Sequence, residues 1–200
     1  MYFSADYITK STMKGTKTKA IDWSILDDFG QKHMDAKNYD LQTFALMILT
    51  GIRTGLRFSD LSKLTVENIK ECENGYRLKG IAKKTKKVFE IPLKAWLVNR
   101  LKVHAKGVHL FSKGGKMVNA MWFHRNMQKH FEHEAKQAKK EGRAIGAHSM
   151  RKAAALKMYA GNKDMNKVRS FLQHRDLATT SDYMEIDRQT LMDAISDAFD

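Results

Sequence analysis

The stretch DLQTFALMILTGIRTGLRFSDLSKL, residues 40–64, contains the longest apolar run of the sequence, at residues 44–49. Apolar residues continue to Ile52, so a helix over about residues 40–54 would be apolar on nearly all sides. Such a helix needs other elements to cover it, and Gly55 is a typical residue to end it. We therefore predict a buried central helix, followed by a short helix from residue 59 or 60 to residue 64.

A small antiparallel sheet is predicted next, over residues 66–91. Asn74-Gly75 is the strongest hairpin signal in the sequence. Residues 76–79 and 88–91 show the alternation of half-buried strands, and the run KKTKK at 83–87 forms a basic turn between them. Pro92 has no backbone N–H and is predicted to end this three-stranded sheet.

Helices account for the rest of the chain, and they are predicted at about residues 22–37, 93–106, 118–140, 149–161, 164–173, 176–186 and 187–200. Asp22 and Asp164 can cap two of these helices, and Gly161 is predicted to end another. Residues 113–116 form a loop. The fold class is mainly α with a small three-stranded antiparallel β-sheet, or α+β. Residues 1–20 are polar and predict a linker or N-terminal arm, and residues 21–200 predict a single domain.

The charge of the chain indicates a polyanionic partner. The sequence has 36 Lys and Arg against 22 Asp and Glu, a net charge of +14. Residues 81–170 carry a net charge of +17, whereas residues 171–200 carry −5. A basic centre of this kind favours nucleic acid first and an anionic membrane surface second.

The composition of the chain argues against several other classes of protein. Cys72 is the only cysteine, so an internal disulfide and a multi-cysteine zinc site are both excluded. The longest apolar run is far too short to span a bilayer, and the first ten residues do not resemble a secretory signal. We expect a cytoplasmic protein in a reducing compartment.

Polar residues that carry chemistry fall at the ends of the predicted elements. His148 and Arg151 are three residues apart, so one helical turn presents both to the same side. Tyr183 follows His174 by nine residues. The full candidate set is Arg57, Lys84, His148, Arg151, His174 and Tyr183.

Four segments together resemble the motifs of one family. TGLRFSDLSKL resembles the first arginine box of the tyrosine recombinases, the phage-integrase family, and KKTKKVFEIPL resembles their β-hairpin lysine segment. HSMR resembles the family's H-x-x-R box, and QHRDLATTSDYMEI resembles its closing box with histidine and tyrosine. The motifs occur in the family's order and cover roughly residues 20–186. The resemblance implies the catalytic-domain fold of the family.

The resemblance also implies a role for each candidate residue. Arg57 and Arg151 would bind the scissile phosphate of double-stranded DNA, and Tyr183 would be the nucleophile that forms a 3′-phosphotyrosyl link. Lys84 would be the general acid, with Lys86 as the second choice. The supporting set comprises His148 and His174 as hydrogen-bonding or proton-handling partners, Asp60 beside the site, and Lys83, Lys86, Lys87 and Lys152 as DNA-binding residues.

Elementary chemistry supports this set of residues. A phenol has a pKa of about 10, so forming the phenolate at pH 7 costs about 4 kcal/mol. Two arginines can bind the oxygens of the attacked phosphate with forked, permanently charged donors. A lysine can protonate the departing sugar oxygen. Because the covalent link to tyrosine conserves the bond, neither a metal nor another cofactor is expected.

Several features leave alternatives open. Each candidate residue taken alone is more often an ordinary surface, cap or core residue. His130 and His133 share a face of the helix predicted over 118–140 and are weak candidates for a metal site beside His124. The last helix carries Leu191, Ile195 and Phe199 at four-residue steps, and can pack on its own domain or dock in trans. Gln173 departs from the family, which usually has glycine there.

The resemblance implies a site-specific recombinase that acts as a tetramer on paired DNA sites, with a DNA-bending accessory protein as a further partner. Integration or excision of a phage or mobile element ranks first among its roles, at the nucleoid of a bacterial or phage-infected cell. The alternatives are a type IB topoisomerase-like nicking-closing enzyme and a non-catalytic basic DNA-binding module. The family's usual N-terminal core-binding domain is absent from residues 1–20.

Overall fold

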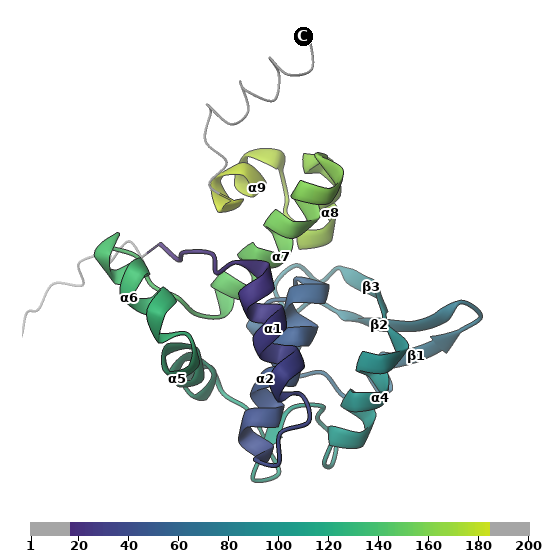
Figure 1. The fold of residues 1–200 in the computed structure, drawn as a ribbon. Coiled ribbons are helices and arrows are strands. Elements are labelled where there is room, and N and C mark those ends of the chain that lie inside the picture. Colours follow the sequence, from purple (N-terminus) through teal and green to yellow (C-terminus); the bar gives the residue numbers. More distant parts are fainter. Residues whose placement is uncertain (1–16, 185–200) are drawn as a thin grey trace, which may run out of the picture.

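The computed structural model describes residues 17–184 of the chain (Figure 1). Helices form most of it, together with one three-stranded and one two-stranded antiparallel sheet. The predicted fold class is confirmed. In chain order the elements are α1 (Trp23–His33), α2 (Tyr39–Thr54), α3 (Phe58–Leu61), a 3-10 helix (Val66–Asn68), β1 (Ile69–Cys72), β2 (Gly75–Ile81), β3 (Val88–Leu93), α4 (Ala95–His104), β4 (Ser112–Lys113), β5 (Lys116–Met117), α5 (Ala120–His130), α6 (Glu132–Lys140), α7 (Ala147–Asn162), α8 (Met165–Leu172) and α9 (Leu177–Met184).

Helix α2 is the centre of the fold, as its apolar sequence predicts. Every residue from 43 to 52 is buried, with α1, α4 and α7 packed around it. Helix α7 approaches so closely that a Cβ on Gly51 would lie 2.1 Å from the sulfur of Met150. This contact fixes the start of α7 against the end of α2, and both carry candidate site residues.

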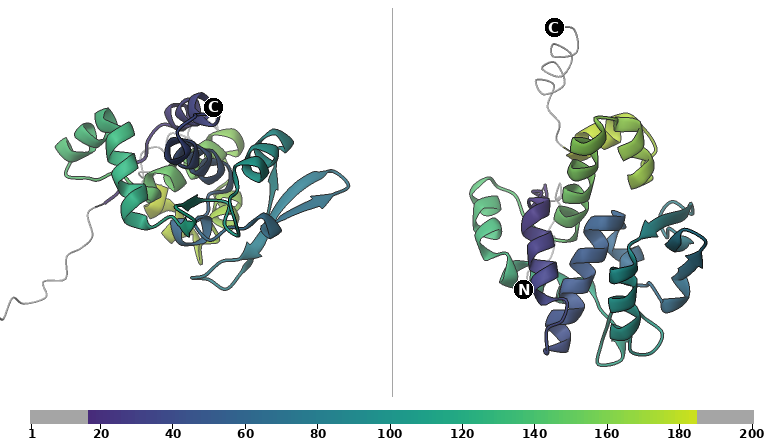
Figure 2. Two further views of the ribbon diagram at one scale, coloured as in Figure 1. Left: turned by 90° about the horizontal axis from the view of Figure 1, so that it is seen from below. Right: turned by 45° about the vertical axis from the view of Figure 1, so that its right-hand side comes forward.

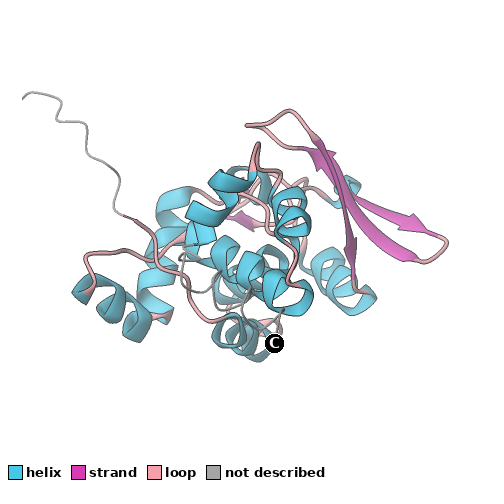
Figure 3. Ribbon diagram, turned by 90° about the horizontal axis from the view of Figure 1, so that it is seen from above, coloured by secondary structure: helices cyan, strands magenta, loops and turns pink. Residues whose placement is uncertain are grey.

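The three-stranded sheet projects from one side of the helical body (Figure 3). Its strand order is β1-β2-β3, and the predicted hairpin joins the first two strands, with the turn at residues 73 and 74 and with Gly75 as the first residue of β2, paired with Cys72. The prediction that Pro92 ends the sheet is wrong, because β3 continues to Leu93 and Pro92 pairs with Arg77. Strand β3 is an edge strand, where a proline that lacks an N–H is tolerated.

The last three described helices form a small unit of their own. Ala155, Val168, Leu172 and Met184 are buried together, separate from the main core. Helix α7 joins the two regions, because its first half packs in the main core and its second half in this smaller cluster. Figure 1 shows α8 and α9 at one end of the molecule, beyond the end of α2. The unit therefore places the turn after α8 and the helix that carries Tyr183 over that end.

The long helix predicted over 118–140 is two helices. Helix α5 ends at His130, and Phe131 has φ −123° and ψ 47°, which interrupts the helical backbone before α6. The Phe131 side chain is buried against Phe29, with ring centroids 5.0 Å apart. Tertiary packing of this ring overrides the continuous helical pattern. Figure 2 shows the pair α5 and α6 on the side of the body opposite the sheet.

Other boundaries differ by a few residues. Helix α1 ends at His33, four residues before the predicted end, and α3 covers only Phe58–Leu61. Helix α7 does not end at Gly161, because its cap is Lys163, whose φ is 51°. The loop predicted at 113–116 is the turn of the two-stranded sheet.

The predicted ends of the chain are only partly covered. Residues 17–19 run beside the segment before α7, where Thr18 forms a parallel bridge with Ala144. Residues 1–16 of the predicted arm and the predicted helix over 187–200 lie outside the described residues.

Candidate active site

Arg57 is placed by a tight turn at the end of α2. Gly55 has φ 60°, a left-handed conformation that favours glycine, and its N–H donates to Gly51 O at 2.8 Å. A Cβ on Gly55 would lie 2.5 Å from the ring of Phe171. The turn therefore needs glycine for two reasons, and Arg57 follows it as the first residue before α3.

Arg151 ties three segments of the chain together. Its side chain is buried, with 4% exposed, in the first turns of α7. The guanidinium donates to Gly55 O at the end of α2 and to Leu172 O at the end of α8. Burial lowers the pKa of Arg151 to about 10, so the group is still charged at pH 7. The two carbonyls and a hydrogen bond with Tyr183 engage three of its five N–H groups, which leaves others to bind an anion.

Tyr183 lies against the start of α7. Its hydroxyl is 3.5 Å from Nδ1 of His148 and donates to the backbone oxygen of the same residue at 3.3 Å. Burial raises the pKa of Tyr183 to about 12, against the opposing charges of Arg151 and Arg57 and a hydrogen bond with Arg151. The phenol is therefore protonated at neutral pH in the DNA-free protein.

His174 lies in the turn between α8 and α9, with its ring edge-on to Tyr183 at 5.2 Å between centroids. Its Nδ1 is 3.2 Å from the hydroxyl of Thr180. Burial, and then the charges of Arg151 and Arg57, lower the pKa of His174 to about 4. The same causes lower the pKa of His148. Both rings are therefore neutral in most molecules at pH 7.

The basic turn between β2 and β3 faces the same site. The N–H of Lys83 donates to Oδ1 of Asp60 at 2.8 Å, so the acidic residue holds the base of the turn. The charge of Lys84 acts on both site histidines and contributes to lowering their pKa values. Lys86 instead lines a separate depression that includes Asp60. This arrangement favours Lys84 over Lys86 as the lysine of the site.

Lys152 differs from the sequence-based expectation. The sequence predicts a DNA-binding residue, whereas Lys152 is only 7% exposed. Its ammonium donates to Thr18 O at 2.7 Å and lies 5.6 Å from the ring centroid of Tyr183. These two contacts hold the Lys152 side chain beside the tyrosine, in the buried first half of α7.

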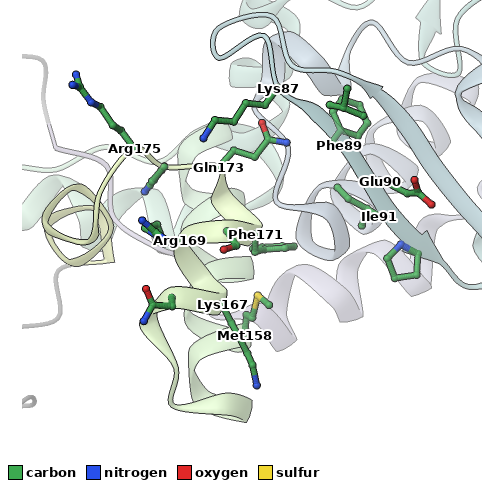
Figure 4. A pocket seen from close by; sticks show the side chains of 15 residues that line it. Lys87, Phe89, Glu90, Ile91, Met158, Lys167, Arg169, Phe171, Gln173 and Arg175 are labelled. Carbon is green, nitrogen blue, oxygen red and sulfur yellow. The ribbon is translucent and has the colours of Figure 1, made fainter.

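A groove of about 800 Å³ adjoins the site between β3 and α8 (Figure 4). Its charged lining is mostly basic, with Lys87, Lys167, Arg169 and Arg175 against Glu90. Figure 4 shows Lys87, Gln173 and Arg175 at the end of the groove nearest the α8–α9 turn. A basic surface therefore continues outward from the candidate site along α8.

The structure thus brings together side chains from five separate parts of the sequence. Arg57, Arg151, Lys84, His148, His174 and Tyr183 lie within electrostatic range of one another. Sequence reasoning missed Thr180 and Thr85, which hold site elements through single hydroxyl groups. No motif marks such residues, since a threonine on a helix or turn has many ordinary uses.

The weak metal candidates are not assembled into a site. His130 packs between aromatic rings of Phe29 and Phe44, and His133 pairs with Gln137 at 2.7 Å. Between residues 17 and 184, no group of three or more metal-ligating side chains is found. Within the same range, no helix has the length and apolar character needed to cross a membrane.

The arrangement of helices and sheet is that of the tyrosine recombinase catalytic domains. Residues 31–190 match the model of the phage integrase family. The chain therefore belongs to the phage integrase family.

Individual relatives agree with this assignment. The chain is 31% identical over 152 residues to the tyrosine recombinase XerC of Caldanaerobacter subterraneus subsp. tengcongensis, covering 72% of this chain and 42% of that protein. Among solved structures, it resembles the XerH site-specific recombinase bound to a palindromic difH substrate, with a TM-score of 0.69, 20% identity and coverage of 94% of this chain and 55% of the other. It also resembles the catalytic domain of bacteriophage HP1 integrase, with a TM-score of 0.55, 17% identity and coverage of 90% and 95%. The chain spans about two fifths of the length of the curated relative.

Proposed function

We propose that this chain is the catalytic part of a site-specific DNA recombinase that cuts and rejoins strands through a 3′-phosphotyrosyl intermediate. The observation that carries the proposal is the convergence of two guanidinium groups and one phenol. Arg57 and Arg151 are 94 positions apart in the sequence, yet their charges act together on Tyr183. In our proposal both guanidinium groups bind a single phosphate that Tyr183 attacks.

The two arginines would stabilise the attacked phosphate. Negative charge builds up on its non-bridging oxygens during attack, and each forked guanidinium can donate to two of them. Removing one such fixed donor typically costs about 3–4 kcal/mol of transition-state stabilisation in enzymes. Arg151 is fixed by its bonds to Gly55 O and Leu172 O, so little reorganisation is needed when DNA binds.

The bond changes balance without an external reactant. The Tyr183 oxygen forms a bond to phosphorus while the bond from phosphorus to the 5′ oxygen breaks. The phenolic proton passes to neutral His148, whose Nδ1 is 3.5 Å away, and the 5′ oxygen receives a proton from Lys84. The same steps in reverse, with a 5′-hydroxyl from another strand, rejoin the DNA. The proposed route uses no metal and no cofactor because the phosphotyrosyl link conserves the bond.

The proposed assembly follows from the stoichiometry of the reaction. One chain carries one site tyrosine and cuts one strand at a time. Exchange of both strands between two duplexes therefore requires four chains, a homotetramer on paired DNA sites. The match to the phage integrase family supports integration or excision of a phage or mobile element as the role. A DNA-bending accessory protein is a further proposed partner.

Covalent capture tests this proposal directly. The probe is a pool of nicked duplexes with randomised sequence, in which the short 5′-hydroxyl strand diffuses away after cleavage and traps the covalent product. We expect the wild-type protein to form a detergent-stable adduct with DNA and Tyr183→Phe to form none. Tyr159→Phe, which removes a hydroxyl on α7 outside the site, is the matched control and should behave like the wild type.

The same substrates separate the alternatives. A protein that binds the pool tightly without any adduct would be a non-catalytic DNA-binding module. An adduct that forms on nearly every sequence, together with relaxation of supercoiled plasmid, would indicate the nicking-closing enzyme. Enrichment of one sequence among the captured strands is the result that our proposal requires.

A further inference from the structure

One side-chain hydrogen bond joins the basic turn to the turn between α8 and α9. The Thr85 hydroxyl donates to Oε1 of Gln173 across 3.1 Å, and both residues are half-buried. Thr85 directly follows Lys84, and Gln173 directly precedes His174. The bond therefore joins the two segments that carry Lys84 and His174 of the proposed site. Figure 4 shows the Gln173 side chain beside that of Lys87, on the side of the groove that faces the hairpin.

The tip of the basic turn, residues 83–87, is held to the rest of the protein by Thr85. Lys83, Lys84, Lys86 and Lys87 are all exposed, and the like charges of such neighbouring lysines repel one another. Thr85 is the residue in the middle of this run, and it is turned inward while its neighbours are exposed. Asp60 holds the first residue of the turn, and Thr85 holds the tip.

Gln173 occupies a backbone position that does not favour a side chain. Its φ is 52° and its ψ is 39°, the left-handed region, where it ends α8 with its N–H bonded to Ser170 O at 3.0 Å. Glycine adopts this conformation without strain, whereas other residues pay a cost. Glycine could end the helix equally well but could not bind Thr85. The side-chain amide, which accepts the hydrogen bond from Thr85, is thus what distinguishes Gln173 from a glycine at this position.

We infer that Gln173 is a positioning residue, whose bond to Thr85 holds the basic turn so that Lys84 stands over the scissile phosphate. This inference rests on the proposed function, in which Lys84 protonates the leaving oxygen. A lysine has a long flexible stem, so proton delivery depends on how firmly its backbone is held. Without the bond, the turn spends less time in the productive position and the protonation step slows.

The first test measures the turn without DNA. Hydrogen exchange followed by mass spectrometry reports the amides of residues 82–88 in the wild type, Gln173→Gly and Thr85→Val. We expect exchange at least fivefold faster in both variants. Lys163→Gly is the matched control, because Lys163 is also a non-glycine helix cap, with φ 51°, and lies at the end of α7. Unchanged exchange in both variants would overturn the positioning role, whatever the protein does with DNA.

The second test asks whether the variants are slow because protonation of the leaving oxygen is impaired. Cleavage is measured in single turnover on two substrates, one with the natural 5′ oxygen at the scissile phosphate and one with sulfur in its place. A thiol has a pKa of about 8.5, far below that of an alcohol, so sulfur leaves without a general acid. We expect Gln173→Gly and Thr85→Val to cut the oxygen substrate at least tenfold more slowly, and the sulfur substrate within threefold of wild type. Thr85→Ser, which keeps the hydroxyl, should recover most of the rate on oxygen.

The outcomes separate the inference from the proposed function. If Lys84→Ala is not rescued by sulfur, the assignment of Lys84 as general acid is wrong. If Lys84→Ala is rescued but Gln173→Gly is slow on both substrates, Gln173 acts on the phosphate or on folding and the inference is wrong. Full rate of Gln173→Gly on the oxygen substrate would also overturn it. Thermal unfolding should show Gln173→Gly as stable as the wild type or more so, since glycine suits its backbone.

Discussion

Arg151 has two tasks that compete for one guanidinium. It fastens the end of α2 to the end of α8 through two carbonyl groups, and in the proposed reaction it also binds the phosphate. Lysine could keep the charge, but a single ammonium cannot hold two carbonyls and a phosphate in fixed directions. We therefore expect the residue to be intolerant of substitution for reasons of both stability and catalysis.

Replacing Arg151 should lower both the stability of the protein and the rate of DNA cleavage. Arg151→Ala leaves two buried carbonyls unpaired, which should lower the free energy of unfolding by about 1–3 kcal/mol. Loss of a fixed donor to the phosphate should slow adduct formation by about 10²–10³-fold. DNA affinity should change by less than about tenfold, because most contacts with phosphate lie elsewhere.

Calorimetry, single-turnover cleavage and a DNA-binding titration measure the three quantities. Arg100→Ala on α4 is the control, since Arg100 is exposed and pairs with Asp35 at 2.9 Å. A drop in affinity that accounts for the whole loss of cleavage would show that Arg151 only holds DNA. Normal cleavage by Arg151→Ala would remove the residue from the site.

The protonation states of the site follow from burial. The raised pKa of Tyr183, about 12, keeps the nucleophile inactive in the free protein. The lowered pKa values of His148 and His174 keep both rings neutral at pH 7 and make them weak bases in the free protein. The site is therefore set for proton transfer only when a phosphate and a leaving group are present.

Sequence motifs identified side chains that the structure brings together, because each lies at a fixed place in a local motif, and their catalytic roles stay predictions. His148 and Arg151 are one helical turn apart, and Tyr183 follows His174 on the next helix. The partners of these residues could not be predicted in the same way. Thr180 and Thr85 make their hydrogen bonds across turns whose geometry depends on tertiary packing, and no local motif marks them. Gln173 stands out in the sequence as a departure from the family's glycine, but its bond to Thr85 is visible only in the structure.

At the scale of elements, the turn that ends α2 sets the position of Arg57. Gly55 combines a left-handed backbone with close contact to Phe171 of α8. The turn thus joins the main core to the small unit that carries His174. A change at this position should disturb the site even though the glycine touches no substrate.

Substitution of Gly55 should destabilise the domain. Gly55→Ala forces a Cβ into φ 60° and to within 2.5 Å of the Phe171 ring, which should cost at least about 2 kcal/mol. For a chain of this size the unfolding midpoint should fall by roughly 4–8 °C. Gly161→Ala is the matched control, because Gly161 lies inside α7 with no atom within 4 Å of its added Cβ. It should raise stability by about 0.5–1 kcal/mol. Equal effects of the two substitutions would show that the turn is not strained.

Element boundaries were predictable where local signals set them. Asp22, Asp164 and the Asn74-Gly75 turn all act as predicted, because caps and tight turns depend on a few adjacent residues. The break at Phe131 was not predictable, since a ring buried against α1 and α2 causes it. The predicted end of the sheet at Pro92 was wrong because an edge strand can contain a proline, and the sequence does not show that β3 is an edge strand.

At the scale of the whole molecule, charge is the main determinant of DNA affinity in our account. The basic groove along α8 and the basic turn both adjoin the proposed phosphate site. Binding of DNA by such a surface releases counterions, so affinity falls as salt rises. The slope of that dependence counts the phosphates in contact.

Lys87 provides a test of which surface faces DNA. The plot of log affinity against log salt should be steep, with a slope of about −0.9 for each phosphate contacted. Lys87→Ala should make the slope less steep by about 0.9, because Lys87 is exposed between the turn and the groove. Lys32→Ala, at the far end of α1, should leave it unchanged. If Lys32 alters the slope and Lys87 does not, the DNA lies on another face.

The most direct measurement is the chemical identity of the link between protein and DNA. After covalent capture on the nicked pool, digestion with nuclease and trypsin leaves a nucleotide attached to one peptide, which mass spectrometry can sequence. We predict a nucleotide joined through its 3′-phosphate to the peptide of residues 176–188, in which Tyr183 is the only tyrosine. Attachment to any other residue, attachment through a 5′-phosphate, or tight binding with no link at all would contradict the convergence of Arg57, Arg151 and Tyr183 on one phosphate.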